Sequence, residues 1–152
     1  MKRIIYTLIL LVLFISCDDR QIVFEKSLLF TDFNTPIVEF SINNEKYNFI
    51  IDSGSEHSFI NEGIINKNDI TDTIYTTIET FQGETDIQRL YKTSILLNDS
   101  LETEMLATNI ISIIKNTFIK SGHIVNGVIG NDFLNKYNAV IDYENKQLIL
   151  HR

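Results

Sequence analysis

From residue 22 onward, short apolar stretches alternate with polar turns along almost the whole chain. Within residues 36–42, for example, Phe40 and Ile42 alternate with Glu39 and Ser41. A period of two residues is typical of a strand with one buried face. Strands are therefore expected at residues 22–30, 36–42, 46–51, 73–80, 86–97, 101–107, 125–130, 139–143 and 147–150.

Only one segment has a clear helical pattern. Residues 132–137 are expected to form a short helix near the C-terminus, with Asn131 or Asp132 as its N-cap. Residues 58–65 fit either a short strand or a single helical turn, and residues 108–119 fit a strand followed by a loop. Many short strands, one short helix and turns at intervals of about 8–12 residues predict a mainly β domain, in the form of a small closed β-barrel.

The N-terminal segment has a different pattern, which is typical of a targeting sequence. Lys2 and Arg3 precede an apolar run, residues 4–16, that ends at Ser16 directly before Cys17. A helix that spans a bilayer needs about 20 apolar residues, so this run is too short, but its length suits the core of a signal peptide. Cys17 is the only cysteine of the chain and therefore has no partner for an internal disulfide.

A small residue before a lone cysteine resembles the lipobox of bacterial lipoproteins, although Phe14 stands where leucine is usual. The resemblance implies cleavage before Cys17 and a lipid anchor on this cysteine, which would place the protein on a bacterial membrane in the cell envelope, facing the periplasm or the surface. An ordinary buried cysteine or an uncleaved anchor is the alternative. The predicted organisation is a signal peptide at residues 1–16, a polar tether at 17–21 and one domain at 22–152.

Composition and charge narrow the functional classes. Removal of residues 1–16 from the 152-residue chain leaves 136 residues, which is enough for one domain with a core, and changes the formal charge from −7 to −9. An acidic protein without a basic run is a poor nucleic-acid binder. The histidines are scattered and no cysteine pair is present, so neither a metal site nor a cofactor is expected. The histidines are His57, His123 and His151.

A candidate catalytic turn follows the apolar strand expected at residues 46–51. There Asp52 is followed by Ser53 and Gly54. Such a turn can hold a carboxyl group at the floor of a cleft, where its surroundings decide whether it is protonated. The same triplet also fits an ordinary turn, in which the Asp and Ser side chains bond to nearby backbone amides.

A serine-hydrolase interpretation of this turn is weaker. Ser55, His57 and Asp52 are the residue types of a catalytic triad, but three side chains so close on one turn rarely align in series. The chain also lacks the Gly-x-Ser-x-Gly turn that exposes the nucleophile of α/β-hydrolases. His57 is therefore expected to be a half-exposed loop residue.

Three features follow one another in the sequence. They are the acidic turn at residues 52–54, a hairpin with Gly83 at its turn, and the segment Gly-Val-Ile-Gly-Asn-Asp-Phe-Leu at residues 127–134. Together they resemble the retropepsin-like aspartic proteases, in particular the single-domain bacterial members, over residues 36–150. The resemblance implies a retropepsin-like fold and an endopeptidase that cleaves peptide or protein substrates without a metal or cofactor.

The resemblance also implies a role for each residue. Asp52 would be the catalytic aspartate, Ser53 would donate a hydrogen bond that supports the loop, and Gly54 would let two backbones approach closely. Gly83 would lie at the tip of a flap that closes over the substrate. The segment 127–134 would pack beneath the catalytic turn.

Aspartic protease chemistry needs two carboxyl groups. One carboxylate takes a proton from water and one carboxylic acid polarises the scissile carbonyl, and at a separation of a few ångströms the pair shares a proton. The chain has a single Asp-[Ser/Thr]-Gly triplet, and Asp132 and Asp142 lie in helix-start and hairpin contexts. The mechanism therefore predicts a homodimer in which Asp52 of two copies meets at a two-fold axis.

A second hypothesis is a catalytically silent lipoprotein that uses the same fold to bind peptides or to assemble. Ser55 stands where the family most often has alanine, and Asn131 stands where many viral members have an arginine that braces the helix. If the chain is a protease, its subsites are expected to be largely apolar and to include Ile51, Phe81 and Ile129.

Overall fold

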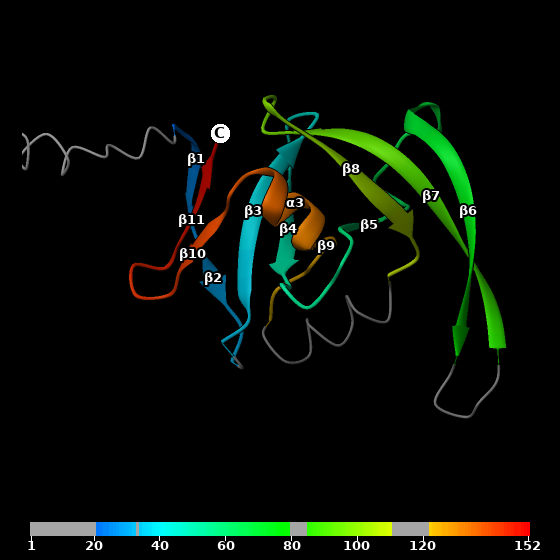
Figure 1. Ribbon diagram of the computed structural model, residues 1–152, viewed down its shortest axis with the longest axis horizontal. Helices are drawn as coiled ribbons and strands as arrows, with labels where there is room; N and C mark the ends of the chain where they lie inside the picture. Colours follow the sequence, from blue (N-terminus) through cyan, green and yellow to red (C-terminus); the bar gives the residue numbers. More distant parts are fainter. Residues whose placement is uncertain (1–20, 33, 80–84, 111–121) are drawn as a thin grey trace, which may run out of the picture.

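The computed structural model describes residues 21–32, 34–79, 85–110 and 122–152, and the side chains of residues 77–88 lie outside the description. Strands make up most of these residues (Figure 1), which confirms the mainly β prediction. The elements are β1 (Ile22–Ser27), β2 (Leu29–Phe30), β3 (Pro36–Ile42), β4 (Glu45–Ile51), β5 (Phe59–Asn61), the 3₁₀ turn η1 (Lys67–Asp69), β6 (Ile70–Glu79), β7 (Thr85–Leu97), β8 (Leu101–Thr108), β9 (Gly127–Ile129), α3 (Asn131–Lys136), β10 (Val140–Asp142) and β11 (Gln147–His151).

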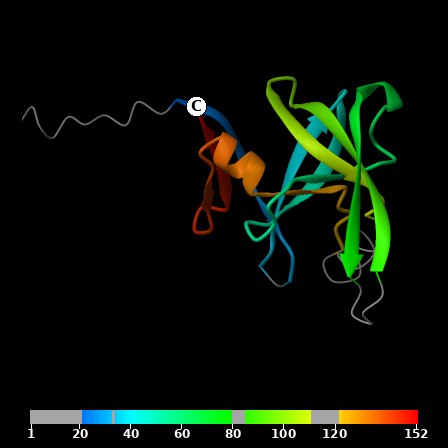
Figure 2. The same ribbon diagram turned by 45° about the vertical axis from the view of Figure 1, so that its right-hand side comes forward.

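The strands form two sheets. The larger has the order β2-β3-β4-β9-β5-β8-β7-β6, and the smaller has the order β1-β11-β10. In the described part of the chain the end strands of the larger sheet, β2 and β6, are not paired with each other, so the expected closed barrel is not observed there. The physical reason is that β6 pairs with β7 along a long hairpin that projects from the body of the protein (Figures 1 and 2), which carries the sheet outward rather than back to β2.

The β3–β4 hairpin delivers the candidate turn to its place. β3 has the predicted bounds. Asn43 and Asn44 join β3 to β4, and their φ angles are 52° and 67°. Both turn residues of a two-residue hairpin that matches the twist of its strands need positive φ, which asparagine tolerates better than most residues. β4 then runs antiparallel to β3 and ends at Ile51, directly before Asp52.

The short strand β9 lies between β4 and β5, and this order shapes the candidate site. β9 is parallel to β4, with Ile51 opposite Ile129, and antiparallel to β5, with Phe59 opposite Val128. The end of β4 and the start of β5 therefore both lie at the C-terminal end of β9. The connection at residues 52–58 must pass over that end, where β9 leads through Gly130 into α3.

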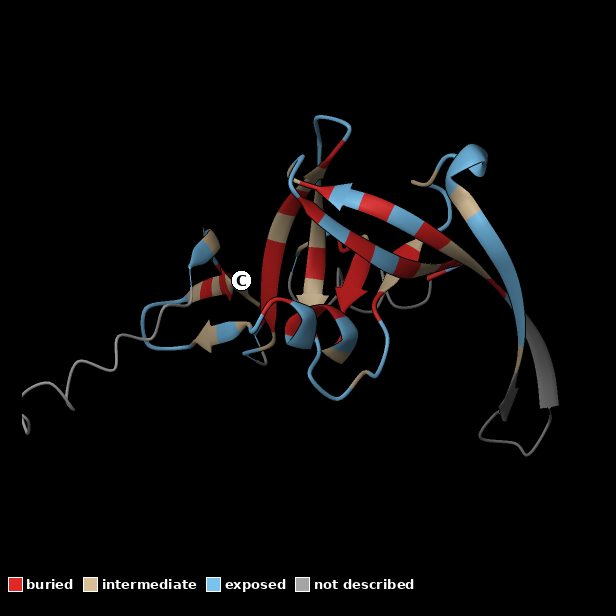
Figure 3. Cartoon of the chain, turned by 45° about the horizontal axis from the view of Figure 1, so that its top comes forward, coloured by how far each residue is buried: buried red, intermediate tan, exposed pale blue. Residues whose placement is uncertain are grey.

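Aromatic side chains fix α3 against the larger sheet. The ring centroid of Phe40 on β3 lies 5.9 Å from that of Phe49 on β4 and 5.8 Å from that of Phe133 on α3, and all three side chains are fully buried. Such edge-to-face pairs add about 0.5–1.5 kcal/mol each to the free energy gained from burial. Tyr137, at the end of the helix, donates a hydrogen bond of 2.8 Å to the Glu102 carbonyl of β8. Figure 3 shows the buried residues gathered where these elements meet.

The smaller sheet packs on the same core. Leu148 and Leu150 of its central strand β11 are fully buried. Glu39 of β3 pairs with Lys26 of β1, across the two sheets, at 3.2 Å, and with Lys46 of the neighbouring strand β4 at 3.0 Å. Hydrogen bonds from these ammonium groups, first Lys46 and then Lys26, lower the pKa of Glu39. Stability from this pairing is present above the ordinary pKa of glutamate and is lost as the pH falls through the lowered value. Since all three groups are partly exposed, the contribution is at most about 1 kcal/mol per pair.

The structure refines three local predictions. The single strand predicted at residues 22–30 is divided into β1 and β2, which belong to different sheets. Residues 58–65 contain the strand β5 and no helical turn, and a 3₁₀ turn follows only at Lys67–Asp69. The helix begins at Asn131, and its N-cap is Gly130 rather than Asn131 or Asp132. Of the segment predicted at 108–119, residues 111–119 lie outside the described residues.

Several predicted functional residues also lie outside the described residues. They are Cys17, the proposed lipid anchor, together with Gly83 and Phe81 of the predicted flap. Within the described segments, no helix has the length and apolar character needed to cross a membrane.

Candidate active site

Asp52 is anchored by its backbone and carries an exposed side chain. Its amide donates a 2.9 Å hydrogen bond to the Ile129 carbonyl, which continues the pairing of β4 with β9 by one residue. Its carboxylate oxygen Oδ1 accepts a 2.9 Å hydrogen bond from the Gly54 amide, and its carbonyl accepts from the Ser55 amide at 3.1 Å. The turn therefore orients the carboxyl group and still leaves it accessible from outside the chain.

Asn131 braces the first half of the turn. Its side-chain amide Nδ2 donates a 2.7 Å hydrogen bond to the Ser53 carbonyl, and its backbone amide donates a 2.8 Å bond to the Ser55 carbonyl. Asn131 occupies the position at which the resemblance places a bracing arginine, so a shorter amide provides a brace here. The Ser53 hydroxyl, predicted to support the loop, makes no hydrogen bond within the described part of the chain and is exposed.

Asp132 binds the second half of the turn. Its amide donates a 3.2 Å hydrogen bond to the Glu56 carbonyl. Its carboxylate accepts a 2.9 Å bond from the Ser58 amide and a further bond from the Ser58 hydroxyl. The Ser58 oxygen in turn accepts a 2.9 Å bond from the Gly130 amide, and Ser58 is fully buried.

These contacts explain the start of α3. The first amides of a helix have no partner within the helix and need another acceptor. Here the carbonyls of Ser55 and Glu56 accept from the amides of Asn131 and Asp132, so Gly130 serves as N-cap without a side-chain bond. The Asn131 side chain is thereby free to hold the turn, and the Asp132 carboxylate holds the turn while it also accepts a 2.7 Å hydrogen bond from the Phe133 amide of its own helix.

No serine-hydrolase triad forms at this turn. The Ser55 hydroxyl donates a 2.7 Å hydrogen bond to the His57 backbone carbonyl, so it is not aimed at the imidazole ring. The His57 ring lies 3.9 Å from a carboxylate oxygen of Asp132, not of Asp52, and its side chain is 52% exposed. His57 is thus the exposed loop residue that the sequence predicted. No cluster of metal-binding side chains is found among the described residues.

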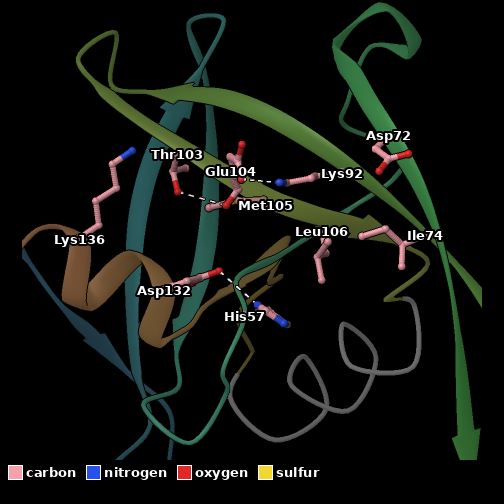
Figure 4. A pocket seen from close by; sticks show the side chains of 10 residues that line it. All are labelled: His57, Asp72, Ile74, Lys92, Thr103, Glu104, Met105, Leu106, Asp132 and Lys136. Carbon is pink, nitrogen blue, oxygen red and sulfur yellow. Dashed lines mark hydrogen bonds and ion pairs between the residues drawn. The ribbon is translucent and has the colours of Figure 1, made fainter.

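A pocket of about 530 Å³ lies beside the turn but does not include Asp52. It is bounded by β6, β7, β8 and α3, and Figure 4 shows His57 and Asp132 on its wall. Its lining combines apolar and charged side chains, including the Lys92–Glu104 ion pair at 2.8 Å. The lining residues are His57, Asp72, Ile74, Lys92, Thr103, Glu104, Met105, Leu106, Asp132 and Lys136.

The apolar subsites predicted from the sequence need a correction. Ile51 is 4% exposed and Ile129 is fully buried, and both belong to the main core cluster. They lie opposite each other in the β4–β9 pairing, where they pack against the interior. Neither side chain is available to line a substrate cleft in this chain.

The sequence model of one protein family, described as retroviral aspartyl protease, matches residues 34–152. The chain belongs to the retroviral aspartyl protease family. A search of curated proteins gave no match.

Solved structures place this retroviral aspartyl protease domain in the retropepsin-like fold. A retropepsin-like aspartic protease from Rickettsia conorii is 14% identical, with a TM-score of 0.52, and the match covers 88% of this chain and 93% of the other. The retroviral protease-like domain of Ddi1 from Leishmania major is also 14% identical, with a TM-score of 0.44 over 78% of this chain and 92% of the other. At 14% identity, the likeness to the first of these structures shows the fold alone.

Proposed function

We propose that the protein is an aspartic endopeptidase that acts as a homodimer, in which Asp52 of each copy supplies one of the two catalytic carboxyl groups. The observation that carries the proposal is the exposed Asp52 carboxyl on a turn fastened to β9 and α3 on both sides. Catalysis by positioning requires that the reactive group is held in a fixed position. Family membership supports the same assignment.

The proposed reaction uses water as the nucleophile. The ionised member of the Asp52 pair takes a proton as the water oxygen attacks the scissile carbonyl carbon, while the protonated member donates a hydrogen bond to the carbonyl oxygen. The carbon–nitrogen bond then breaks as the amine nitrogen receives a proton. The two carboxyl groups can exchange roles because they share one proton between them.

A face for the second copy is available beside the turn. A shallow hollow of about 390 Å³ lies between the turn and β10, and Ser53 and Asn131 are at its edge. Val140 of β10 is 44% exposed, and β10 is an edge strand of the smaller sheet. An unpaired strand edge next to an apolar side chain favours association with another chain. Contact at this hollow would bring the exposed Ser53 hydroxyl and the Asp52 carboxyl towards their copies.

The direct test is cleavage of a peptide library by the purified mature chain, residues 17–152, across about pH 3–7. We expect specific activity to rise with protein concentration through the dimer dissociation constant, because a single chain supplies only one carboxyl. Analytical ultracentrifugation under the same conditions gives that constant independently. A stable dimer that cleaves no peptide in this pH range would contradict the proposal.

A silent peptide-binding module is the second candidate. The bond from the Gly54 amide to Asp52 is also the one that an ordinary Asx turn makes, so it is compatible with either function. The two candidate functions differ in whether bound peptide is cleaved. A comparison of the wild-type chain with Asp52→Asn distinguishes them.

We also propose that Cys17 carries a lipid that anchors the protein to a bacterial membrane. The support is the sequence pattern of residues 1–17 alone. Expression of the full chain in a bacterium should place the protein in the membrane fraction, and Cys17→Ser should move it to the soluble fraction or leave it with its signal peptide. Equal fractionation of the two proteins, with the signal peptide removed from both, would contradict the anchor.

A further inference from the structure

The Asp132 carboxylate is shared among three hydrogen-bond donors. Oδ2 accepts from the Ser58 amide at 2.9 Å, and Oδ1 accepts from the Ser58 hydroxyl and from the Phe133 amide at 2.7 Å. Oδ2 also faces His57 Nδ1 at 3.9 Å. The carboxylate thus connects α3 to the strand end at which the catalytic turn returns to the sheet.

All three groups donate to the carboxyl oxygens of Asp132, which act as acceptors in each of these bonds. The Ser58 oxygen accepts a hydrogen bond from the Gly130 amide, so the hydroxyl proton is free to point at Asp132. Because Ser58 is fully buried, a donor that loses its partner there gains no replacement from water.

We propose that Asp132 is a positioning residue of the active site: its carboxylate fixes the returning arm of the turn, and through that arm the orientation of Asp52. The inference rests on the proposed protease function. Asp132 never contacts the reacting atoms, because its bonds reach residues 56–58 and not Asp52. It acts through the backbone, in which five residues lie between Asp52 and Ser58.

The other charged groups near Asp132 lie in the pocket of Figure 4. His57 approaches from the turn, Lys136 from α3, and Lys92, Glu104 and Asp72 from β7, β8 and β6. Lys92 pairs with Glu104 at 2.8 Å, and Lys136 donates to the Glu102 carbonyl at 2.6 Å. These contacts engage both lysines elsewhere, so the bonds from Ser58 and Phe133 define the position of the carboxylate.

The test compares Asp132→Asn, Ser58→Ala and the double variant in the dimeric chain. In either orientation of the new amide, its NH₂ group faces the Ser58 or the Phe133 amide, so one donor loses its partner. We expect Asp132→Asn to lower kcat about tenfold and to change KM less than about twofold, since misplacement of a catalytic group by a fraction of an ångström has effects of this size. The double variant should lose no more than the worse single variant, because both substitutions break one network.

Asp72→Asn is the matched control. It removes a carboxylate from the same pocket, but Asp72 bonds only its neighbour, the Thr73 amide at 2.7 Å, among the hydrogen bonds of the described residues. Its kcat should stay within about twofold of wild type. Amide hydrogen exchange at Ser58 should accelerate in Asp132→Asn and remain unchanged in Asp72→Asn.

Two results would overturn the inference while the protease function stands. One is a wild-type kcat in Asp132→Asn, and the other is a loss in Asp132→Asn that is fully additive with the loss in Ser58→Ala. If the wild-type chain itself cleaves nothing, the proposed function fails, and the exchange rate at Ser58 decides whether Asp132 holds the turn. An unchanged rate in Asp132→Asn would refute that role as well.

Discussion

Asp52→Asn is expected to lower kcat/KM for peptide cleavage by at least about 10³-fold, since it removes both the base and the acid from a homodimer. Asparagine has nearly the same shape as aspartate, and its Oδ1 can still accept the hydrogen bond from the Gly54 amide. The melting temperature should therefore stay within about 2 °C of wild type. Steady-state kinetics and thermal unfolding of the same preparation measure both quantities.

The stability of the proposed dimer should change in the opposite direction to the activity. Two carboxyl groups held a few ångströms apart repel each other when both are ionised. Asp52→Asn removes that repulsion, so its dimer should be at least as stable as wild type at neutral pH, where the wild-type pair carries the most charge. Sedimentation equilibrium at matched concentrations provides this comparison.

Asp99→Asn is a suitable control for the loss of charge. Asp99 is exposed in the β7–β8 turn, where its φ of 56° suits asparagine. This variant should retain full activity. If Asp52→Asn cleaves peptides as fast as Asp99→Asn, Asp52 is not the catalytic residue, and the silent binding module becomes the better interpretation.

Strand positions could be predicted from the sequence because their signals are local. β3 was predicted with its observed bounds, and β7, β8 and β11 were predicted to within one residue at each end. Each strand combines period-two burial with an adjacent turn of asparagine, aspartate or glycine residues. Both of these signals are local, so they do not depend on distant parts of the chain. β6 begins three residues earlier than predicted because its first residues gain pairing from β7, which no local pattern reveals.

The candidate site shows what a sequence pattern omits. Asp52 was identified from its triplet and from the segment at residues 127–134, and the structure brings these two parts together. The roles of Asn131 and Ser58 were missed, because both depend on the crossing of the turn over β9. The N-cap was wrongly assigned for the same reason: carbonyls from residues 55 and 56 replaced the side-chain cap that local rules favour. Asp132 was dismissed as a catalytic partner, and its contacts give it a different role.

Gly130→Ala is expected to destabilise the fold by about 3 kcal/mol, near the upper end of the usual range for overpacking. A Cβ atom at this position would lie 2.4 Å from the His57 carbonyl oxygen and 2.6 Å from its carbonyl carbon. Both are backbone atoms, so no side-chain rotation relieves the contact. The φ of Gly130 is −100°, which any residue adopts, so glycine is needed here for space and not for its backbone freedom.

Under the proposed function the consequence extends from stability to catalysis, because the atoms that the new methyl group would meet belong to the turn that carries Asp52. To admit a methyl group, the segment around His57 must move away from β9, and this strains the bonds from Asn131 and Asp132 that fix the turn. Gly130→Ala should therefore lose activity beyond the fraction that is unfolded. Urea unfolding measures the loss of stability and the unfolded fraction, and kcat per folded dimer measures the loss of activity.

Gly63→Ala is the control for the glycine substitution itself. The nearest atom to a Cβ at Gly63 is Asn61 Oδ1 at 3.9 Å, an ordinary contact. Its stability should change by less than about 1 kcal/mol, with a small gain possible because alanine restricts the unfolded chain. If Gly130→Ala were as stable and active as Gly63→Ala, the close packing of the turn on β9 would not be what positions Asp52, and the proposed role of Asp132 would lose its structural basis too.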